Sequence, residues 1–197
     1  LSMYGNNVSG IKNKTVINQT FGKFGESIQF SGTNAGGNTN YFMNISNSSS
    51  LDSFNKTGQI SIETWFYIAN DLSTQTIELV NLLGAENGTR RLNLRTSFLS
   101  GSRVISSYVD NGDAGESANG ATGISNNQWY HAAMTYDKQT LKVYLNGILD
   151  GSLAIVSYIP SINWTAIGDS PTQRFNISMD DVAIWNITLN NDAIAEH

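Results

Sequence analysis

Residues 110–116, with the sequence Asp-Asn-Gly-Asp-Ala-Gly-Glu, could bind a metal ion. Four oxygen-bearing side chains fall within these seven residues, those of Asp110, Asn111, Asp113 and Glu116. Calcium takes about six to eight oxygen ligands from carboxylates, amides and backbone carbonyls. The acidic spacing differs from that of an EF-hand, and no flanking helices are expected. Two interpretations follow, a calcium-binding loop and a solvated turn.

The sequence lacks the residue patterns required for nucleophilic or zinc chemistry. A serine nucleophile needs a histidine base, yet the two histidines are His131, in an expected buried strand, and His197, at the end of the sequence. Neither a Gly-x-Ser-x-Gly elbow nor a glycine-rich phosphate loop is present. Without cysteine or paired histidines, zinc is not expected. We interpret His131 as a structural residue, hydrogen-bonded across strands.

Several aromatic side chains could form a sugar-binding surface, because sugars bind to aromatic platforms flanked by planar polar groups. The candidates are Trp65, Tyr67, Trp164, Trp185, Tyr108 and Tyr130. The alternative for each is packing in the core. Trp164 also lies within the sequence Asn163-Trp164-Thr165, where a glycan could shield it. The sequence therefore leaves the ligand-binding residues unknown.

The sequence is rich in acceptor sites for N-glycosylation. Asn-x-Ser/Thr occurs ten times, at Asn7, Asn13, Asn18, Asn44, Asn47, Asn55, Asn87, Asn163, Asn176 and Asn186. Since 39 of 197 residues are Ser or Thr, chance placement of 24 Asn gives roughly five. The excess favours a glycosylated surface protein over an accident of composition. Dense sequons without cysteine favour an archaeal cell surface over an animal secretory pathway.

Composition restricts the class of protein further. The chain has 197 residues, 40% of them hydrophobic and 14% charged, which is long enough for one well-cored domain. Its net charge is −5 and it has no run of Lys or Arg, so nucleic acid is not an expected partner. No apolar run approaches the ~20 residues that span a bilayer. The sequence begins with Leu1, and we interpret it as a mature segment or an excerpt of a longer protein.

Hydrophobic periodicity predicts an all-β protein. Short apolar or alternating runs recur between turn residues, and no long helical period is present. Residues 60–68 alternate, with Glu63, Trp65 and Tyr67 on one face. Residues 129–136, 141–145 and 148–155 predict a three-stranded meander, since Asn146-Gly147 is typical of a tight hairpin turn. Residues 110–125 read as a polar loop, and residues 192–196 as a short terminal helix.

Five segments, in order, resemble the laminin-G-like family of concanavalin A-like jelly rolls. They are residues 24–32 (FGESIQFSG), 60–66 (ISIETWF), 127–136 (NQWYHAAMTY), 141–147 (LKVYLNG) and 179–186 (MDDVAIWN). The resemblance implies a two-sheet antiparallel β-sandwich over residues 22–197 in a single-domain chain. Residues 1–21 match poorly and are expected to be an edge strand or a linker.

The resemblance also implies a second possible calcium site. In related sandwiches an acidic residue in the last strand helps to bind a structural ion, and the Asp-x-Val spacing here gives that role to Asp180, with Asp181 as a weaker candidate. The alternative is an Asp pair that accepts backbone N–H groups or faces solvent. Structural calcium is therefore the one cofactor that we expect.

Catalysis is not expected, although related sandwiches include β-glucan hydrolases. These enzymes carry two Glu flanking an Asp at alternating positions on one strand, and the sequence has no Glu-x-Asp pattern. We expect a non-catalytic extracellular adhesion module that binds a glycan or a surface protein. One alternative is a structural block of a surface layer, filament or spike, which would contact neighbouring copies. Another is an accessory domain of a larger secreted enzyme.

Overall fold

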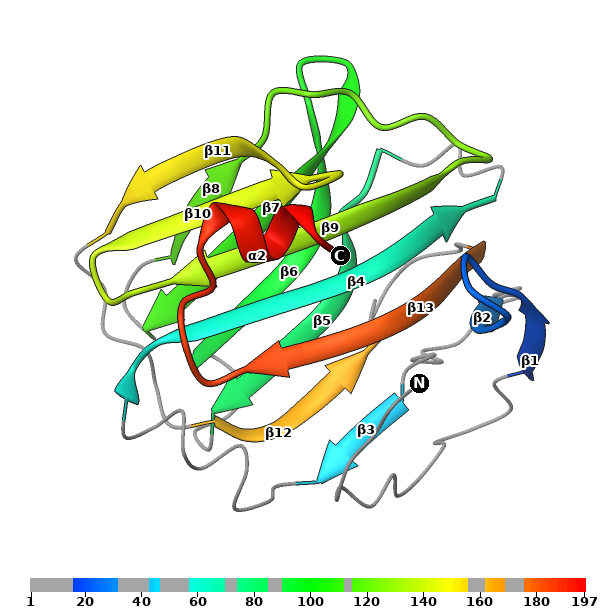
Figure 1. Cartoon of the computed structure of the whole chain (residues 1–197), viewed down its shortest axis with the longest axis horizontal. Coiled ribbons are helices and arrows are strands. Elements are labelled where there is room, and N and C mark those ends of the chain that lie inside the picture. The colour runs from blue at the N-terminus through cyan, green and yellow to red at the C-terminus, as the bar shows by residue number, and fades with distance from the viewer. Residues whose placement is uncertain are drawn as a thin grey trace.

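The computed structural model describes residues 16–31, 43–46, 57–69, 74–84, 90–111, 115–155, 162–168 and 176–197. These residues form two antiparallel sheets and a short helix near the C-terminus (Figure 1). One continuous hydrophobic cluster fills the space between the sheets, with contributions from both. The predicted all-β, two-sheet sandwich is therefore confirmed.

The first sheet has seven strands and carries all five segments that resemble the jelly-roll family. In spatial order they are β1 (Val16–Phe21), β2 (Glu26–Ser31), β13 (Asn176–Trp185), β4 (Ile60–Ile68), β9 (Trp129–Tyr136), β10 (Thr140–Leu145) and β11 (Ile148–Ala154). The pairing of β1 with β2 places the described end of the N-terminal segment at the sheet edge. This agrees with an edge strand there, while the division of the chain into domains stays a prediction.

The second sheet has six strands and a more polar sequence. In spatial order they are β3 (Met43–Ser46), β12 (Ile162–Ile167), β5 (Ile77–Gly84), β6 (Arg90–Leu99), β7 (Ser102–Asn111) and β8 (Gly115–Asn119). The prediction of a loop over residues 110–125 was wrong at its start. Asp110 belongs to β7 and pairs with Gly115 of β8, because short polar strands at a sheet edge lack the apolar alternation that identifies a strand.

Side chains alternate between the core and the outer face as the sequence of β4 predicts. Ile62 and Phe66 are fully buried between the sheets, whereas Glu63, Trp65 and Tyr67 point out of the sandwich. The central strands β4 and β9 pair along their whole lengths, and Trp65 lies opposite His131. The outer face of the seven-stranded sheet therefore gathers several aromatic side chains beside two ionisable ones.

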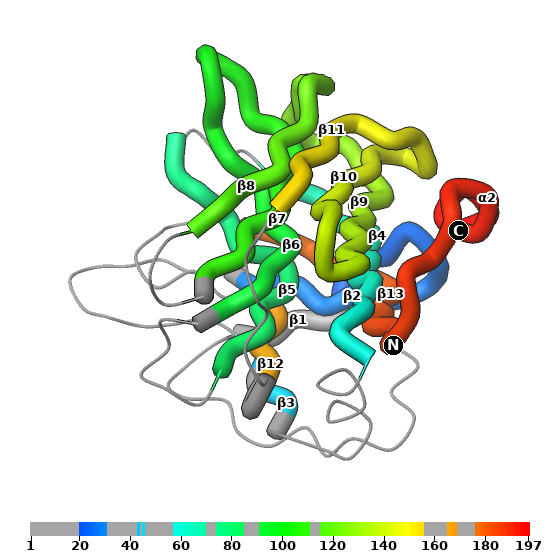
Figure 2. The backbone as a smooth tube through the Cα atoms, turned by 90° about the vertical axis from the view of Figure 1, so that its left-hand side faces the viewer, coloured from blue at the N-terminus to red at the C-terminus, as the bar shows by residue number. Residues whose placement is uncertain are grey.

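The meander β9–β10–β11 confirms the hairpin expected at Asn146-Gly147. Both turn residues have positive φ, 50° at Asn146 and 78° at Gly147, as this tight turn requires. After β13 the chain crosses back over this sheet and forms helix α2 (Asn191–Ala195), capped by the Asn190 side chain. Figure 2 shows α2 outside the seven-stranded layer.

Helix α2 is attached to the outer face of the sheet by a small hydrophobic cluster. Ile194 is fully buried against Ala133 of β9 and Tyr144 of β10, with Leu189 beside them. The Tyr144 hydroxyl also donates a hydrogen bond to the Asn191 side chain over 3.0 Å. These contacts hold the end of the helix next to β9, where it forms one wall of a pocket.

Candidate ligand-binding site

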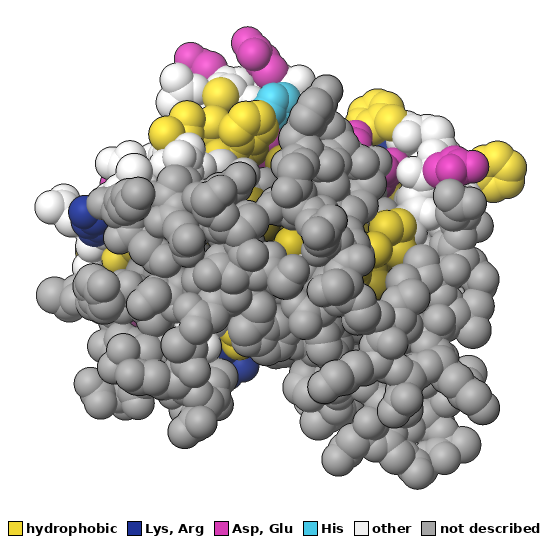
Figure 3. All heavy atoms as spheres, turned by 90° about the horizontal axis from the view of Figure 1, so that it is seen from below, with side chains coloured by type: hydrophobic (Ala, Val, Ile, Leu, Met, Phe, Trp, Pro, Cys, Tyr) yellow, Lys and Arg dark blue, Asp and Glu magenta, His cyan; other side chains and the backbone are white. Residues whose placement is uncertain are grey.

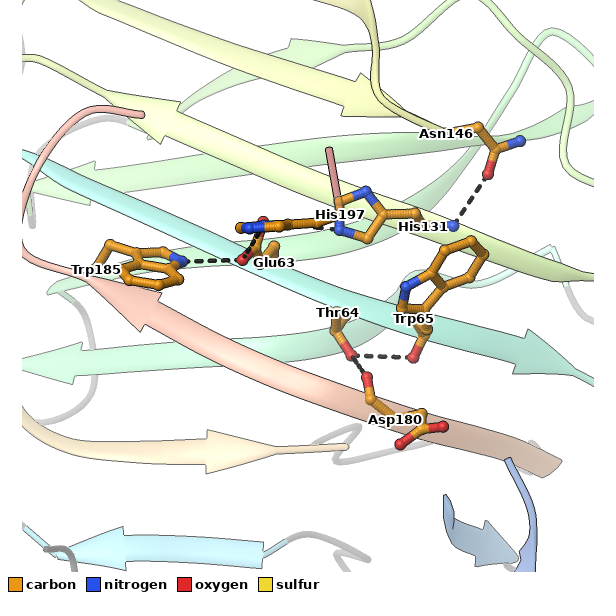
Figure 4. A network of polar contacts seen from close by, with 8 residues as sticks. All are labelled: Glu63, Thr64, Trp65, His131, Asn146, Asp180, Trp185 and His197. Carbon is orange, nitrogen blue, oxygen red and sulfur yellow. Dashed lines mark hydrogen bonds and ion pairs between the residues drawn. The ribbon is translucent and has the colours of Figure 1, made fainter. Parts of the chain in front are cut away.

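Glu63 is a buried carboxylate on the outer face of the seven-stranded sheet. It is 4% exposed, because Trp185 of β13 and the residues after α2 cover it. Its Oε1 atom accepts a hydrogen bond from the Trp185 indole N–H at 3.0 Å and lies 2.9 Å from His197 Nδ1 (Figure 4). The Trp185 and His197 rings stack, with centroids 6.2 Å apart. Three distant chain segments therefore meet at one carboxylate.

His131 of β9 lies next to this carboxylate and is 3% exposed. Its Nε2 atom is 3.7 Å from Glu63 Oε2. Burial lowers the pKa of His131 below 6.5, and Glu63 offsets this only in part, so the imidazole is neutral at pH 7. Among the described residues, neither His131 Nδ1 nor Glu63 Oε2 has a hydrogen-bond partner. Buried polar atoms without partners are costly, and functional sites are one place where they are found.

The backbone of His131 is tied to the turn between β10 and β11. The His131 N–H donates to Asn146 Oδ1 at 3.0 Å, and the Asn146 N–H donates to the His131 carbonyl at 2.8 Å. This reciprocal pair fixes the turn beside the imidazole, as Figure 4 shows for the side-chain bond. The turn therefore forms a rigid rim next to His131.

An aromatic row lies along the same face. The Trp65 ring is 5.7 Å from Phe24 in an edge contact and 5.4 Å from the His131 ring. The ammonium group of Lys23 lies 4.5 Å from the Trp65 ring centroid, a cation–π contact. Farther along the strands, Tyr67 contacts Trp129 with centroids 5.6 Å apart. Two half-buried tryptophans and one lysine therefore lie within reach of a bound molecule.

These residues line a pocket of about 440 Å³. Strands β4 and β9 form its floor. The β1–β2 turn, the β10–β11 turn and the end of α2 surround it. The lining residues are Lys23, Trp65, Trp129, His131, Asn146, Gly147, Ile194, Ala195, Glu196 and His197. Small-molecule pockets commonly have volumes of about 300–1,000 Å³ and combine apolar walls with a few polar groups. The pocket has the size and chemistry to bind a polar ring of one or two units.

Below the pocket, the outer face of the sheet remains open near the end of β13. Trp185 is 38% exposed and Ile187 is 50% exposed. Figure 3 shows histidine, acidic and hydrophobic side chains close together at one edge of the face that is seen from below. The His197 side chain is 42% exposed, so the network around Glu63 reaches the surface.

Asp180, the first candidate calcium ligand, is buried in β13 and accepts two backbone hydrogen bonds. Its Oδ1 accepts from the Asp181 N–H and its Oδ2 from the Phe24 N–H, each at 3.0 Å. Asp181 is exposed and has a φ of 45° at a bulge in the strand. In the part of the chain that the structure describes, no group of three acidic or histidine side chains is arranged around a common metal position. Calcium at Asp180 stays a prediction.

The residues of the second candidate calcium site are separated by the strands that carry them. Asp110 lies on the outer face of the six-stranded sheet and accepts a hydrogen bond from the Tyr108 hydroxyl at 2.9 Å. Glu116 pairs with Val109, whose side chain is buried between the sheets. The Glu116 side chain therefore lies on the inner face of the sheet, opposite to that of Asp110. Asp113 lies outside the described residues. The structure therefore does not bring Asp110 and Glu116 together.

The aromatic candidates for a sugar surface divide between several places. Trp65 lies in the pocket and Tyr67 next to it, whereas Trp185 binds Glu63, Tyr130 is buried and Tyr108 lies on the other sheet. The Trp164 side chain lies outside the described residues. His131 is buried, as the structural interpretation expects, but its imidazole faces Glu63.

The sequence interpretation missed Lys23, Glu63, Trp129 and Asn146 as site residues. The alternation of β4 predicted that Glu63 points outward, and the turn signal located Asn146. Neither pattern indicated which outward side chains would contact one another.

The predicted glycosylation sites are only partly within the described residues. Asn186 is exposed after β13, and Asn176 Oδ1 accepts a hydrogen bond from the Gln29 side chain at 2.8 Å. For the sequons in β1, β3 and β12 the structure describes the backbone alone, at Asn18, Asn44 and Asn163. The remaining sequons lie outside the described residues, at Asn7, Asn13, Asn47, Asn55 and Asn87. Glycosylation stays a prediction at all ten positions.

Comparison with protein families gives one match over most of the chain. The profile of the Laminin_G_3 family, of the concanavalin A-like lectin/glucanases superfamily, matches residues 29–195. No curated protein sequence matches the chain significantly. In the described residues, no helix is long and apolar enough to cross a membrane.

Solved structures with a similar fold include binding domains of botulinum neurotoxins. The serotype G binding domain has a TM-score of 0.70 and 16% identity, covering 99% of this chain and 46% of that one. A structure of type C, a toxin that depends on interaction with two ganglioside molecules to enter cells, has a TM-score of 0.72 and 14% identity over 98% and 46%. The binding domain of neurotoxin DC, in complex with rat synaptotagmin II, has a TM-score of 0.73 and 11% identity over 98% and 46%. The chain spans about half the length of these toxin domains.

Proposed function

Because this chain belongs to the concanavalin A-like lectin/glucanase superfamily, we propose that it is a non-catalytic binding module. The pocket beside α2 binds a glycan of a cell surface or matrix. One observation carries the proposal, the pocket of about 440 Å³ in which Trp65 and Trp129 stand beside the buried imidazole of His131. The module is part of a glycosylated surface protein and binds its ligand outside the cell, which agrees with the excess of sequons in the sequence.

The chemistry of the pocket suits a sugar ring. Apolar C–H faces of a sugar stack on tryptophan, while hydroxyl groups exchange hydrogen bonds with planar polar side chains. The neutral imidazole of His131 can accept a hydrogen bond from a hydroxyl group at Nδ1, the atom without a partner among the described residues. Lys23 can donate to a ring or hydroxyl oxygen from the opposite rim. A ligand hydroxyl that reached this buried nitrogen would give it the partner that it lacks among the described residues.

Similar folds support binding rather than catalysis as the activity. The neurotoxin structures are binding domains, one from a toxin that interacts with gangliosides and one in complex with a receptor protein. Glu63 Oε1 accepts a hydrogen bond from Trp185 and lies 2.9 Å from His197 Nδ1, so this oxygen is already engaged within the protein. The proposed ligand is therefore held and released unchanged.

A glycan-array screen of the glycosylated protein tests the proposal, run in calcium and again in chelator. We expect saturable binding that Trp129→Ala reduces at least about fivefold, since a stacked aromatic contributes on the order of 1 kcal/mol or more. Phe98→Ala is the matched control, because Phe98 is an exposed aromatic at the β6–β7 turn of the other sheet. Loss of binding in chelator would support the calcium prediction at Asp180.

Two results would contradict the proposed glycan site. One is the absence of binding to any glycan or cell-surface preparation in either buffer. The other is equal binding by the Trp129 and Phe98 variants, which would move the ligand away from the pocket.

An assembly role is the second candidate function, and one edge of the sandwich favours it. Strand β11 lies at the edge of the seven-stranded sheet, with Ile148 71% exposed and Leu149 44% exposed. Apolar edge strands are templates for pairing with another chain. Sedimentation of wild type and Ile148→Lys separates the two functions. Self-association that the substitution abolishes supports an assembly block, and a monomer at high concentration contradicts it.

A further inference from the structure

The outer face of the six-stranded sheet carries a second cluster of charged and polar side chains, on the opposite side of the sandwich from the pocket. Arg91 and Arg95 lie on the same face of β6, on either side of Asn93. Tyr108 of β7 pairs directly with Asn93, so its ring stands between the two arginines. The register of one strand pair thus places two positive charges around one aromatic ring.

Both guanidinium groups contact this ring. The Cζ atom of Arg91 is 5.0 Å from the Tyr108 ring centroid, and that of Arg95 is 4.5 Å away. The Tyr108 hydroxyl in turn donates a hydrogen bond to Asp110 Oδ2 at 2.9 Å. A side chain at Gly115 would collide with the Tyr108 ring, so the glycine lets the ring lie across β8. The ring is therefore held in place as the centre of the cluster.

The arginines are only partly satisfied by this chain. Arg95 donates hydrogen bonds to the neutral hydroxyls of Ser117 at 3.0 Å and Ser106 at 3.5 Å. Burial lowers the pKa of Arg95, with Glu78 opposing and Arg91 adding to the effect, which marks a charge that has lost water. Arg91 contacts Glu78 at 3.5 Å, but its Nε atom is buried with no acceptor among the described residues. Arg95 thus has neutral hydroxyls as its acceptors, while Arg91 contacts the Glu78 carboxylate and lies opposite Asp110 in the strand pair.

Near the arginines, two amide side chains have carbonyl oxygens that lack a hydrogen-bond donor among the described residues. Asn81 and Asn93 both donate to the Glu78 carboxylate, at 2.6 and 3.3 Å. Their carbonyl oxygens are buried and have no donor among the described residues. Because these oxygens are buried, the groups that a ligand can reach are those of the half-buried Arg91 and Arg95, which call for an anionic acceptor.

We propose that the cluster of Arg91, Arg95 and Tyr108 is a second binding site, which takes the oxyanion of an acidic polysaccharide. The oxyanion is a carboxylate or a sulfate, because the planar guanidinium fork binds either through two hydrogen bonds. The Tyr108 ring offers a stacking surface beside the two guanidinium groups.

Binding of defined polymers to the full chain at low salt tests this site. The probes are polygalacturonate for the carboxylate, dextran sulfate for the sulfate and plain dextran as the neutral polymer. We expect one or both acidic polymers to bind, to weaken as salt rises, and to bind well above plain dextran. Binding of polygalacturonate alone would identify a uronate ligand, and binding of dextran sulfate alone a sulfated one.

Matched variants locate the binding. Arg91→Gln should weaken it by about tenfold or more, the expected loss for a charged hydrogen bond. Lys142→Gln removes the same charge from β10 on the other sheet and should change the affinity less than about twofold. Arg91→Lys, which keeps the charge but not the fork, should fall between them. Thermal melting of each variant verifies folding, and Arg91 tolerates substitution because its side chain is 35% exposed.

Equal binding of plain dextran and of both acidic polymers would overturn the inference. Equal losses of affinity in the Arg91→Gln and Lys142→Gln variants would overturn it as well. Trp129→Ala should leave polygalacturonate and dextran sulfate binding unchanged. Failure of the glycan pocket and failure of this site are therefore separate outcomes.

Discussion

The two outer faces of the sandwich use buried carboxylates in different ways. On the seven-stranded sheet, Glu63 is covered by aromatic rings and by residues after α2, and the neighbouring histidine is neutral. On the six-stranded sheet, Glu78 accepts hydrogen bonds from two amides and lies near two arginines. One face is an aromatic pocket beside a buried carboxylate, and the other carries two arginines around one aromatic ring. The same fold therefore offers two surfaces with different ligand preferences.

The largest effect on stability is expected at Glu63. Glu63→Ala leaves the Trp185 indole N–H and His197 without their acceptor, at a cost of about 2–3 kcal/mol in the free energy of unfolding. Glu63→Gln keeps one acceptor oxygen and should cost roughly half as much. Urea denaturation measures both. Glu26→Ala, at an exposed position on β2, is the control and should stay within about 0.5 kcal/mol of wild type.

A smaller effect is expected at Glu78, because part of its surroundings is open to water. Glu78→Gln removes the charge that opposes Arg91 and Arg95, and should cost about 0.5–1 kcal/mol, less than Glu63→Gln. The same urea experiment compares it with Glu63→Gln. If the Glu78 variant proved much less stable than the Glu63 variant, the charged face would be the one that supports the fold, contrary to our account.

The pH dependence of stability should separate the faces further, since both histidines of the sequence lie at the Glu63 network. The pKa of His131 is lowered by burial, so below its ordinary value of 6.5 the unfolded chain binds a proton that the folded chain does not. The free energy of unfolding should therefore fall as pH drops from about 6.5 toward 5. Thermal melting over this range measures the slope. His131→Gln should flatten it, and an unchanged slope in this variant would assign the effect to other groups.

The sequence predicted the central part of the fold and only half of the site. Alternation along residues 60–68 identified the outward face of β4, and Asn146-Gly147 identified the turn that lines the pocket. The contacts of Glu63 could not be predicted, because Trp185 and His197 lie 122 and 134 residues away in the chain. Strand β8 was missed because Gly115–Asn119 has no apolar alternation and is defined by pairing with β7.

The pocket between β9 and α2 is the proposed binding site of a glycan. The most direct test is an NMR titration of the ¹⁵N-labelled protein with a glycan identified on the array. It follows the side-chain N–H signals of the four tryptophans and of Asn146. We predict that the Trp65, Trp129 and Asn146 signals shift together and saturate at one ligand concentration, while the backbone signals of Arg91 and Arg95 do not move. Shifts confined to the six-stranded sheet, with Trp65 and Trp129 unchanged, would contradict the claim.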